Sequence, residues 1–232
     1  MNTQSDGSTL NTRIIDPSGG SNQTRVRAYN ERLVMALVRR HGSLAKAEIA
    51  RRSGLSPQTV TVIMRALEKD LLLVKGEPVR GRVGQPSVPM ALNPDAVFSI
   101  GLKIGRRSAD MVLMDFVGGV RRKLRETYAY PLPQQILDFA RRGLDILSGE
   151  LDTLERQRLV GIGIAAPFEL WNWLDQVGAP SDEMDAWRDF DFTVAMASIS
   201  DLPVVIQNDA TAACGAELVF GRGREFSDFA YF

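Results

Sequence analysis

The chain has 232 residues, of which 44% are hydrophobic and 24% charged, a composition typical of a globular protein with room for two small domains. No run of about 18 apolar residues is present, so the sequence predicts no membrane-spanning helix, and the polar N-terminus lacks the features of a secretory signal. The single cysteine, Cys214, and the single histidine, His41, exclude an intrachain disulfide and a Cys/His zinc site. We therefore expect a cytoplasmic protein that has no membrane partner and holds no metal ion.

The charge is balanced overall but is divided unevenly along the chain. Residues 1–92 contain 14 Lys and Arg against 7 Asp and Glu, whereas residues 93–232 contain 14 against 21. This division predicts a basic module that binds a polyanion, followed by an acidic domain, although charged stretches are more often only solvated surfaces. Residues 1–23 are polar and poor in core-forming side chains, and we expect them to form a disordered lead.

Apolar spacing and capping residues predict three helices, at residues 27–40, 43–53 and 57–69, and two short strands, at about residues 72–75 and 88–92. Ser43 is expected to cap the second helix. Gly54 predicts a tight turn, and Ser56 with Pro57 predicts the start of the third helix. Three helices followed by a hairpin predict a winged helix-turn-helix DNA-binding domain over residues 24–92.

The third helix carries at its N-terminal end the side chains that a recognition helix needs. Small polar groups there reach base edges in the major groove, where Gln pairs with adenine and Thr offers a hydroxyl or a methyl group. Arginines beside such a helix neutralise phosphates. The residues that we expect to contact DNA in this region are Ser56, Gln58, Thr59, Thr61, Arg51 and Arg65. The alternative is an ordinary three-helix bundle with Ser and Thr on its surface.

The segment between the two short strands strengthens the DNA-binding interpretation. Arg80 and Arg82 lie in a glycine-rich hairpin tip, and Arg is the side chain that the negative potential of a narrow minor groove favours. We expect both arginines to contact DNA as part of a wing. Gly and Pro by themselves mark only a turn, so a solvated β-turn is the alternative.

The pattern changes near Asn93-Pro94, where we place the domain boundary. Strands are predicted at residues 98–104, 110–115, 124–130, 159–166 and 204–207, and helices at residues 134–158 and 210–220. The apolar run at 159–166 predicts a strand covered on both faces, and 204–207 is expected to be another buried strand. This order of elements predicts an α/β lobe with a mixed sheet over residues 93–232.

Several segments, taken in order, resemble the ROK family (repressor, open reading frame, kinase), specifically its regulators. They are residues 55–60 (LSPQTV), 81–86 (GRVGQP), 161–167 (GIGIAAP) and 207–213 (QNDATAA). The resemblance covers the chain from about residue 25 onward and implies a partial actin-like (ribonuclease H-like) sugar-kinase lobe. It also implies that Asn208 and Asp209 bind a sugar, since the Asp of this motif is the general base of the family's kinases. Both residue types also favour an N-cap before the following helix.

The sequence departs from the family's kinase pattern in the first hairpin of the lobe. Kinases of the family have an Asp-x-Gly-Gly-Thr phosphate loop there, and this chain has Lys103, Arg106 and Arg107. A cation cannot help to hold Mg²⁺, so we expect no catalytic residue, no cofactor and no kinase activity from Asp209. The second lobe and the Cys/His zinc motif of full-length members are also missing, and we expect a truncated product or a fragment.

The sequence therefore favours a transcriptional regulator of carbohydrate metabolism, a repressor rather than an enzyme. Its expected partners are a double-stranded DNA operator, a sugar or sugar-phosphate effector, and a second copy in a homodimer, because paired half-sites suit helix-turn-helix proteins. Two alternatives stay open. One is an ATP-dependent sugar kinase of the ROK type, and the other is a non-catalytic scaffold with a vestigial sugar cleft.

Overall fold

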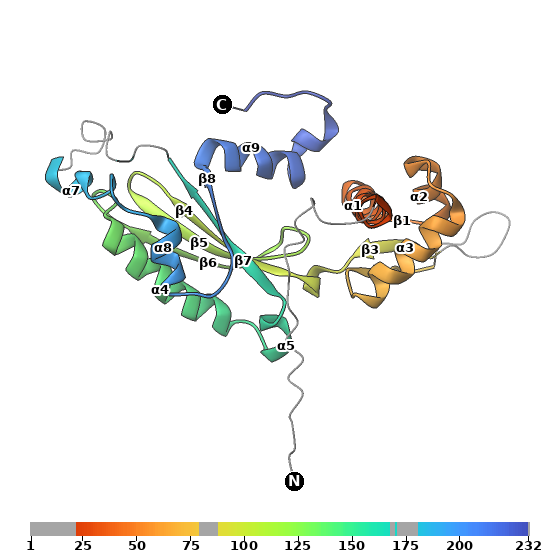
Figure 1. Cartoon of the computed structure of the whole chain (residues 1–232), viewed down its shortest axis with the longest axis horizontal. Helices are drawn as coiled ribbons and strands as arrows, with labels where there is room; N and C mark the ends of the chain where they lie inside the picture. The colour runs from red at the N-terminus through yellow and green to blue at the C-terminus, as the bar shows by residue number, and fades with distance from the viewer. Residues whose placement is uncertain (1–21, 79–87, 168–169, 171–180, 232) are drawn as a thin grey trace, which may run out of the picture.

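A computed structural model describes residues 22–78, 88–167, 170 and 181–231. The elements form two groups, and each group encloses its own apolar core (Figure 1). The first group contains α1 (Asn22–His41), β1 (Ser43–Leu44), α2 (Lys46–Ser53), α3 (Pro57–Lys69), β2 (Leu73–Lys75) and β3 (Met90–Leu92). None of the helices in these described ranges is long and apolar enough to cross a membrane.

The first core is built from one apolar stripe on each of the three helices. The stripe of α3 recurs at the spacing of helical turns and is buried: it consists of Val60, Ile63, Met64 and Leu67. An antiparallel sheet in the order β1–β3–β2 closes this core. The three helices and the strands β2 and β3 therefore occur in the predicted order, although α1 begins five residues earlier than predicted.

The second helix starts later than predicted. Ser43 does not cap it, because Ser43 and Leu44 form β1 and pair with β3. The helix begins at Lys46, and Ala45 occupies the N-cap position without a side-chain capping hydrogen bond. Leu44 is buried in the first core, and this burial favours the strand over a cap at Ser43.

The turn between α2 and α3 confirms the predicted start of the third helix. Gly54 has φ of +71°, a left-handed conformation, and its N–H donates to the Ala50 carbonyl over 3.1 Å. The Ser56 hydroxyl accepts a hydrogen bond from the N–H of Thr59 over 3.1 Å, and Pro57 occupies the first helical position. The N-terminal end of α3 is thus fixed by both its turn and its cap.

The second group forms an α/β lobe around a five-stranded mixed sheet. It contains η1 (Pro94–Ala96), β4 (Phe98–Ile104), β5 (Ser108–Asp115), β6 (Val120–Thr127), α4 (Pro133–Gly149), α5 (Thr153–Arg156), β7 (Leu159–Ala166), α7 (Ser181–Asp185), α8 (Phe192–Ala197), β8 (Val204–Asn208), α9 (Asp209–Val219) and η3 (Arg222–Glu225). The strand order is β6–β5–β4–β7–β8, with β4 to β6 antiparallel and β4, β7 and β8 parallel. The carboxyl ends of these three parallel strands meet at one edge of the sheet.

β6 begins four residues earlier than the sequence predicted. The turn before it is tight because Gly118 has φ of +92° and because the Asp115 carboxylate holds the turn from inside. That carboxylate accepts hydrogen bonds from the N–H groups of Val117 (3.1 Å) and Gly119 (2.7 Å), and Asp115 is buried. Strand pairing therefore resumes at Val120.

The single helix predicted over residues 134–158 is two helices, α4 and α5. Asp152 starts the second one with a capping box: its carboxylate accepts from the N–H groups of Leu154 and Glu155. The Glu155 carboxylate in turn accepts from the Asp152 N–H over 2.9 Å. A cap of this kind inside an amphipathic pattern divides the helix, and apolar periodicity alone does not reveal it.

The apolar runs predicted that β7 is covered on both faces and that β8 is buried. Among the described residues, both strands instead have exposed side chains. Val160 in β7 is 44% exposed, and Val205 and Ile206 in β8 are 68% and 39% exposed. The helix α4 packs its apolar side chains against one face of the sheet, where the second core lies. On the opposite side, among the described elements, α9 faces the sheet (Figure 1). The difference arises because a strand's hydrophobicity predicts burial but not which element provides it.

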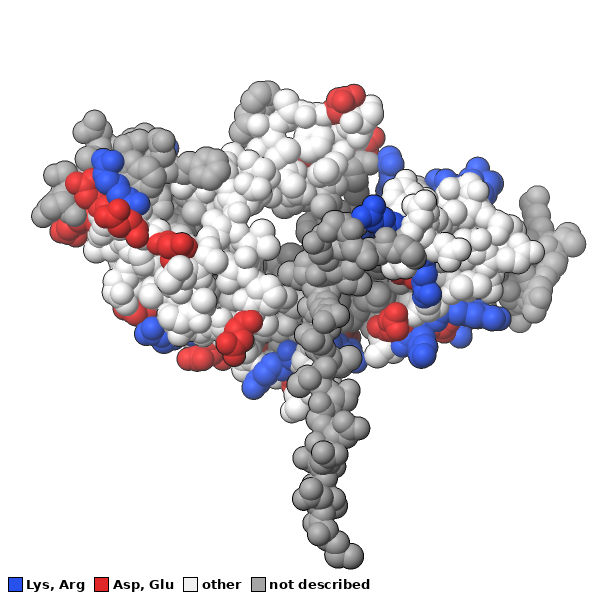
Figure 2. All heavy atoms as spheres, in the orientation of Figure 1, with Lys and Arg blue, Asp and Glu red and all other residues white. Residues whose placement is uncertain are grey.

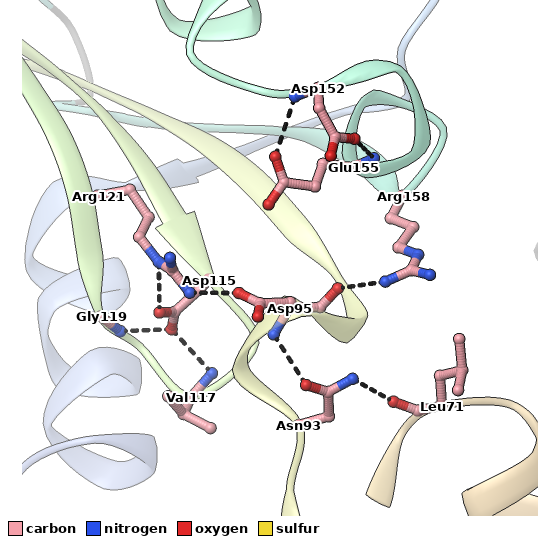
Figure 3. A network of polar contacts seen from close by, with 10 residues as sticks. All are labelled: Leu71, Asn93, Asp95, Asp115, Val117, Gly119, Arg121, Asp152, Glu155 and Arg158. Carbon is pink, nitrogen blue, oxygen red and sulfur yellow. Dashed lines mark hydrogen bonds and ion pairs between the residues drawn. The ribbon is translucent and has the colours of Figure 1, made fainter. Parts of the chain in front are cut away.

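Polar contacts fix the link between the two groups (Figure 3). The Asn93 side-chain amide donates to the Leu71 carbonyl over 2.8 Å, and its Oδ1 accepts from the N–H of Asp95 over 3.2 Å. From the other side, Arg158 donates to the Asp95 carbonyl (2.8 Å) and Arg121 pairs with the Asp95 carboxylate (2.6 Å). The short segment that joins the two cores is therefore anchored to both.

Candidate nucleic-acid interface and ligand hollow

The N-terminal turn of α3 presents the small polar side chains that the sequence singled out. Gln58 is exposed, whereas Thr59 and Thr61 are half-buried. The hydroxyls of Ser56 and Thr59 lie 2.9 Å apart, and the Thr61 hydroxyl donates to the Pro57 carbonyl over 2.8 Å. Gln58 is therefore the residue of this turn whose polar group has no partner within the described part of the chain.

The two arginines proposed for phosphate contacts lie in different settings. Arg65 is exposed on α3. Arg51, at the end of α2, pairs with Glu48 through two hydrogen bonds of 2.6 and 2.8 Å, and Arg52 pairs with the same carboxylate. The hydrogen bond from Arg51, assisted by Arg52, lowers the pKa of Glu48 to about 2. A phosphate would have to share Arg51 with a carboxylate that stays ionised.

The proposed wing residues Arg80 and Arg82 lie outside the described residues. What the structure does describe is the base of that hairpin, where the Gly76 N–H donates to the Pro89 carbonyl over 2.8 Å. Figure 2 shows Lys and Arg side chains over the N-terminal elements, with a few carboxylates among them. The contacts of the wing with DNA stay a prediction.

A residue that the sequence analysis did not single out lies one turn after Gln58. Val62 is 63% exposed, although it is in the middle of α3. It borders a hollow of about 610 Å³ between α3 and the N-terminal half of α1, to which α1 contributes Val26, Arg27 and Asn30. The spacing of four residues between Gln58 and Val62 was the signal in the sequence, because it places both side chains on one face of a helix.

A second hollow, of about 390 Å³, lies at the edge of the sheet where the parallel strands end. Lys103 of β4 and Ala165 of β7 are paired across the sheet, and both line this hollow together with Asp209 and the small residues that follow it in α9. Ligands of open α/β sheets bind at this edge. The structure thus brings Asp209 and Lys103 to one hollow, although they are 106 residues apart in the sequence.

Asn208 has a different position from Asp209. Its Oδ1 accepts hydrogen bonds from the N–H groups of Ala210 (3.1 Å) and Thr211 (3.2 Å), so Asn208 is the N-cap of α9. It is not among the residues that line the hollow. The N-cap interpretation is confirmed for Asn208, whereas sugar binding by Asn208 and Asp209 stays a prediction.

Two of the cations of the first hairpin, Lys103 and Arg107, have different surroundings. Lys103 faces the hollow, whereas the Arg107 guanidinium donates to the carbonyl of Ala129 on the other side of the β4–β5 turn. Tyr128 holds the same turn: its hydroxyl donates to the Gly105 carbonyl over 2.8 Å. Within the ranges that the structure describes, no three His, Cys, Asp or Glu side chains come together as metal ligands. Lys103 thus lines the same hollow as Asp209.

Residues 27–70, which include α2, α3 and most of α1, match a family described as winged helix-turn-helix DNA-binding. The xylose repressor of Bacillus subtilis is 23% identical over 216 residues, which cover 91% of this chain and 54% of that protein. NagC of Escherichia coli, a DNA-binding transcriptional dual regulator, is 28% identical over 147 residues, 61% of this chain and 35% of NagC. The protein y4fQ of Sinorhizobium fredii is 26% identical over 206 residues, 88% of this chain and 52% of y4fQ.

The fold is shared with a crystal structure of a ROK family transcriptional regulator, described as a homolog of the E. coli MLC protein. The TM-score is 0.58 at 18% identity, over 87% of this chain and 50% of the other. The architecture is therefore an N-terminal winged helix-turn-helix followed by an α/β lobe, a fold shared with that regulator. The chain spans about half the length of the curated relatives y4fQ and xylose repressor.

Proposed function

We propose that the protein is a DNA-binding transcriptional repressor of the ROK family that responds to a sugar or a sugar phosphate. The observation that carries this proposal is the N-terminal turn of α3, where the Ser56 cap and Pro57 fix the helix and leave the Gln58 amide free for a base edge. This turn lies inside the match to winged helix-turn-helix domains. Relatives that match 61% to 91% of this chain are named as a repressor and a transcriptional regulator.

In this proposal residues 24–92 bind DNA and residues 93–232 bind the effector, after a lead over residues 1–23. The contacts to bases and phosphates come from Ser56, Gln58, Thr59, Thr61, Arg51, Arg65, Arg80 and Arg82. The partner is a double-stranded operator in the cytoplasm, and two copies of the protein bind two half-sites as a homodimer, because a paired geometry multiplies the affinity of a single recognition helix.

The effector binds in the sheet-edge hollow, where Asp209 accepts hydrogen bonds from sugar hydroxyls and Asn208 fixes the start of α9. The named relatives support this class of effector, since their names refer to xylose and, for a second E. coli protein, to N-acetylglucosamine. Lys103 lines the same hollow and would repel Mg²⁺. We therefore infer that the site binds without catalysing phosphoryl transfer.

A matched pair of glutamine variants tests the DNA-binding part. Gln58 and Gln134 are both exposed, and each follows a proline at the first position of a helix. The protein selects a preferred sequence from random duplex DNA, and the affinity of each variant for that sequence is measured against scrambled DNA. We expect Gln58→Ala to lose about 5- to 100-fold in specific affinity, as for one base contact, while Gln134→Ala keeps wild-type affinity. A protein that stays folded and selects no sequence at low salt would refute the proposal.

A thermal-shift panel tests the effector part. Xylose, N-acetylglucosamine and their phosphates are added to the wild-type protein and to Asp209→Asn, which keeps the Oδ1 acceptor for the Ala210 N–H. We expect at least one compound to raise the Tm of the wild type and to have a smaller effect on the variant. Release of ADP from ATP in the presence of any of these sugars would instead favour the kinase, and the absence of any shift would favour the scaffold.

A further inference from the structure

The exposed face of α3 contains an apolar residue that neither the first core nor helix stability explains. Val62 is 63% exposed, whereas the core of this group is formed by the opposite stripe of the helix. A β-branched residue also has a lower helix propensity than the Lys, Glu or Gln usual at exposed positions. The side chain of Val62 therefore has an apolar surface that nothing in the described chain covers.

The surroundings of Val62 are those of the proposed DNA interface. It borders the hollow of about 610 Å³ between α1 and α3 together with Gln58 and Thr59, two of the proposed base-contacting residues. The α1 wall adds Arg27 and Asn30. Arg27 is exposed and shares its charge with Glu31 over 2.9 Å, and Arg65 is exposed at the next turn of α3. An apolar surface framed by cations and amides suits a polyanion that also offers an apolar group.

The major groove of DNA offers one such group. Of the four bases, only thymine presents a methyl group there, and aliphatic side chains contact it. Gln58 and Val62 are four residues apart, or about 6 Å along the helix axis. That separation corresponds to about two steps of a DNA strand at about 3.4 Å each. One helix face can therefore contact an adenine through Gln58 and a nearby thymine through Val62.

We propose that Val62 determines sequence specificity by packing against the methyl group of a thymine in the major groove, within about two base pairs of the base that Gln58 contacts. This inference rests on the proposed DNA-binding function and adds to it a residue and a base. Deoxyuridine differs from thymidine only by this methyl group. Its use at single positions therefore removes the proposed contact without changing the hydrogen-bonding pattern of the base pair.

The experiment uses the full chain and the duplex that it selects from random DNA. Each thymidine is replaced in turn by deoxyuridine, and affinities are measured for the wild type, Val62→Ala and Val194→Ala. Val194 is 68% exposed on α8 and serves as the matched control. We expect deoxyuridine at one position of each half-site to weaken wild-type and Val194→Ala binding about fourfold, as for the loss of one methyl-sized contact. Val62→Ala should bind the duplex with deoxyuridine at that position and the unmodified duplex equally.

Three results overturn the inference. If deoxyuridine has no effect on wild-type affinity at any position, no methyl group is contacted, although sequence selection would still support the proposed function. If Val62→Ala keeps the full sensitivity to deoxyuridine, another residue makes the contact. If Val62→Ala changes the sedimentation coefficient of the protein while its sequence preference is retained, the hollow is covered by a second copy. A failure to select any sequence would refute both the inference and the proposed function.

Discussion

The guanidinium of Arg39 lies 5.4 Å from the centroid of the Phe220 ring. Arg39 belongs to α1 of the first group, and Phe220 directly follows α9, whose first turn borders the hollow at the sheet edge. The same guanidinium lies 5.1 Å from the ring of Phe116, which packs against the first core from the turn between β5 and β6. One cation thus contacts aromatic rings from two parts of the α/β lobe, and burial lowers its pKa from the ordinary value.

Removal of this cation should loosen the junction between the two groups. Cation–π contacts contribute about 0.5–1 kcal/mol when exposed and about 2 kcal/mol when desolvated, and Arg39 is only partly buried. We expect Arg39→Ala to lower the free energy of unfolding by about 1 kcal/mol, measured by urea denaturation. Arg40→Ala is the control, since Arg40 is exposed on the same helix. Equal effects of the two variants would show that the ring contacts add no stability.

Gly118 controls the position of Phe220. It has φ of +92°, and a Cβ at this position would overlap the Phe220 ring. Gly42 provides the control, because it has φ of +77° but open space around it. We expect Gly42→Ala to cost about 1–2 kcal/mol of unfolding free energy from backbone strain alone, and Gly118→Ala to cost more.

A double-mutant cycle separates the two effects at Gly118. If the new methyl group displaces the Phe220 ring, Arg39→Ala should cost less in the Gly118→Ala background than in the wild type. Additive free energies of unfolding for these two substitutions would mean that the ring adjusts without leaving Arg39.

The stability of the protein should depend on Tyr128 in alkali. Burial, reinforced by the charges of Asp110 and Glu126, raises the pKa of Tyr128 well above its ordinary value of 10. The folded state thus favours the neutral phenol. The contribution of Tyr128 to the free energy of unfolding is therefore complete below pH 10 and is lost as the pH rises above 10. We expect the free energy of unfolding to fall progressively as the pH rises above about 10, and to fall less in Tyr128→Phe.

Tyr29→Phe is the control for the alkaline effect, because Tyr29 is 66% exposed. Its alkaline loss of stability should match that of the wild type. A Tyr128→Phe protein that loses as much stability as the wild type over the same pH range would assign the effect to other groups.

Two substitutions at Ser56 separate its cap from its proximity to DNA. Ser56→Ala removes the hydrogen bond to the Thr59 N–H and should cost about 1 kcal/mol of unfolding free energy. Ser56→Asp keeps a capping oxygen and should keep that stability, but it places a negative charge where the phosphates would lie. We expect Ser56→Asp to weaken DNA binding at low salt by at least about tenfold. Wild-type affinity in this variant would place Ser56 away from the DNA.

The sequence predicted the elements whose signals are local. The start of α3 follows from Ser56 and Pro57. The predicted bounds of β4 follow from alternating apolar residues and those of β7 from a continuous apolar run. Two boundaries were wrong where a carboxylate binds nearby backbone N–H groups, a contact that apolar periodicity does not reveal. The Asp115 carboxylate shortens the turn before β6, and the Asp152 capping box divides a helix pattern that looked continuous.

The candidate sites were predicted only in part. Asn208 and Asp209 are adjacent in the sequence, yet one caps α9 and the other lines the hollow. The approach of Lys103 to Asp209 depends on the parallel pairing of β4, β7 and β8, which no sequence window contains. Val62 was missed because the DNA contacts of this helix were predicted only from its polar and basic side chains.

The link at Asn93 and Asp95 is short and is hydrogen-bonded to both groups. Hydrogen bonds hold it to Leu71 on one side and to Arg121 and Arg158 on the other. These contacts should restrict rotation of α3 relative to the α/β lobe when the protein binds DNA. In a dimer, the distance between two such helices would be nearly constant. Operators whose half-sites are displaced by even one base pair would then bind with lower affinity.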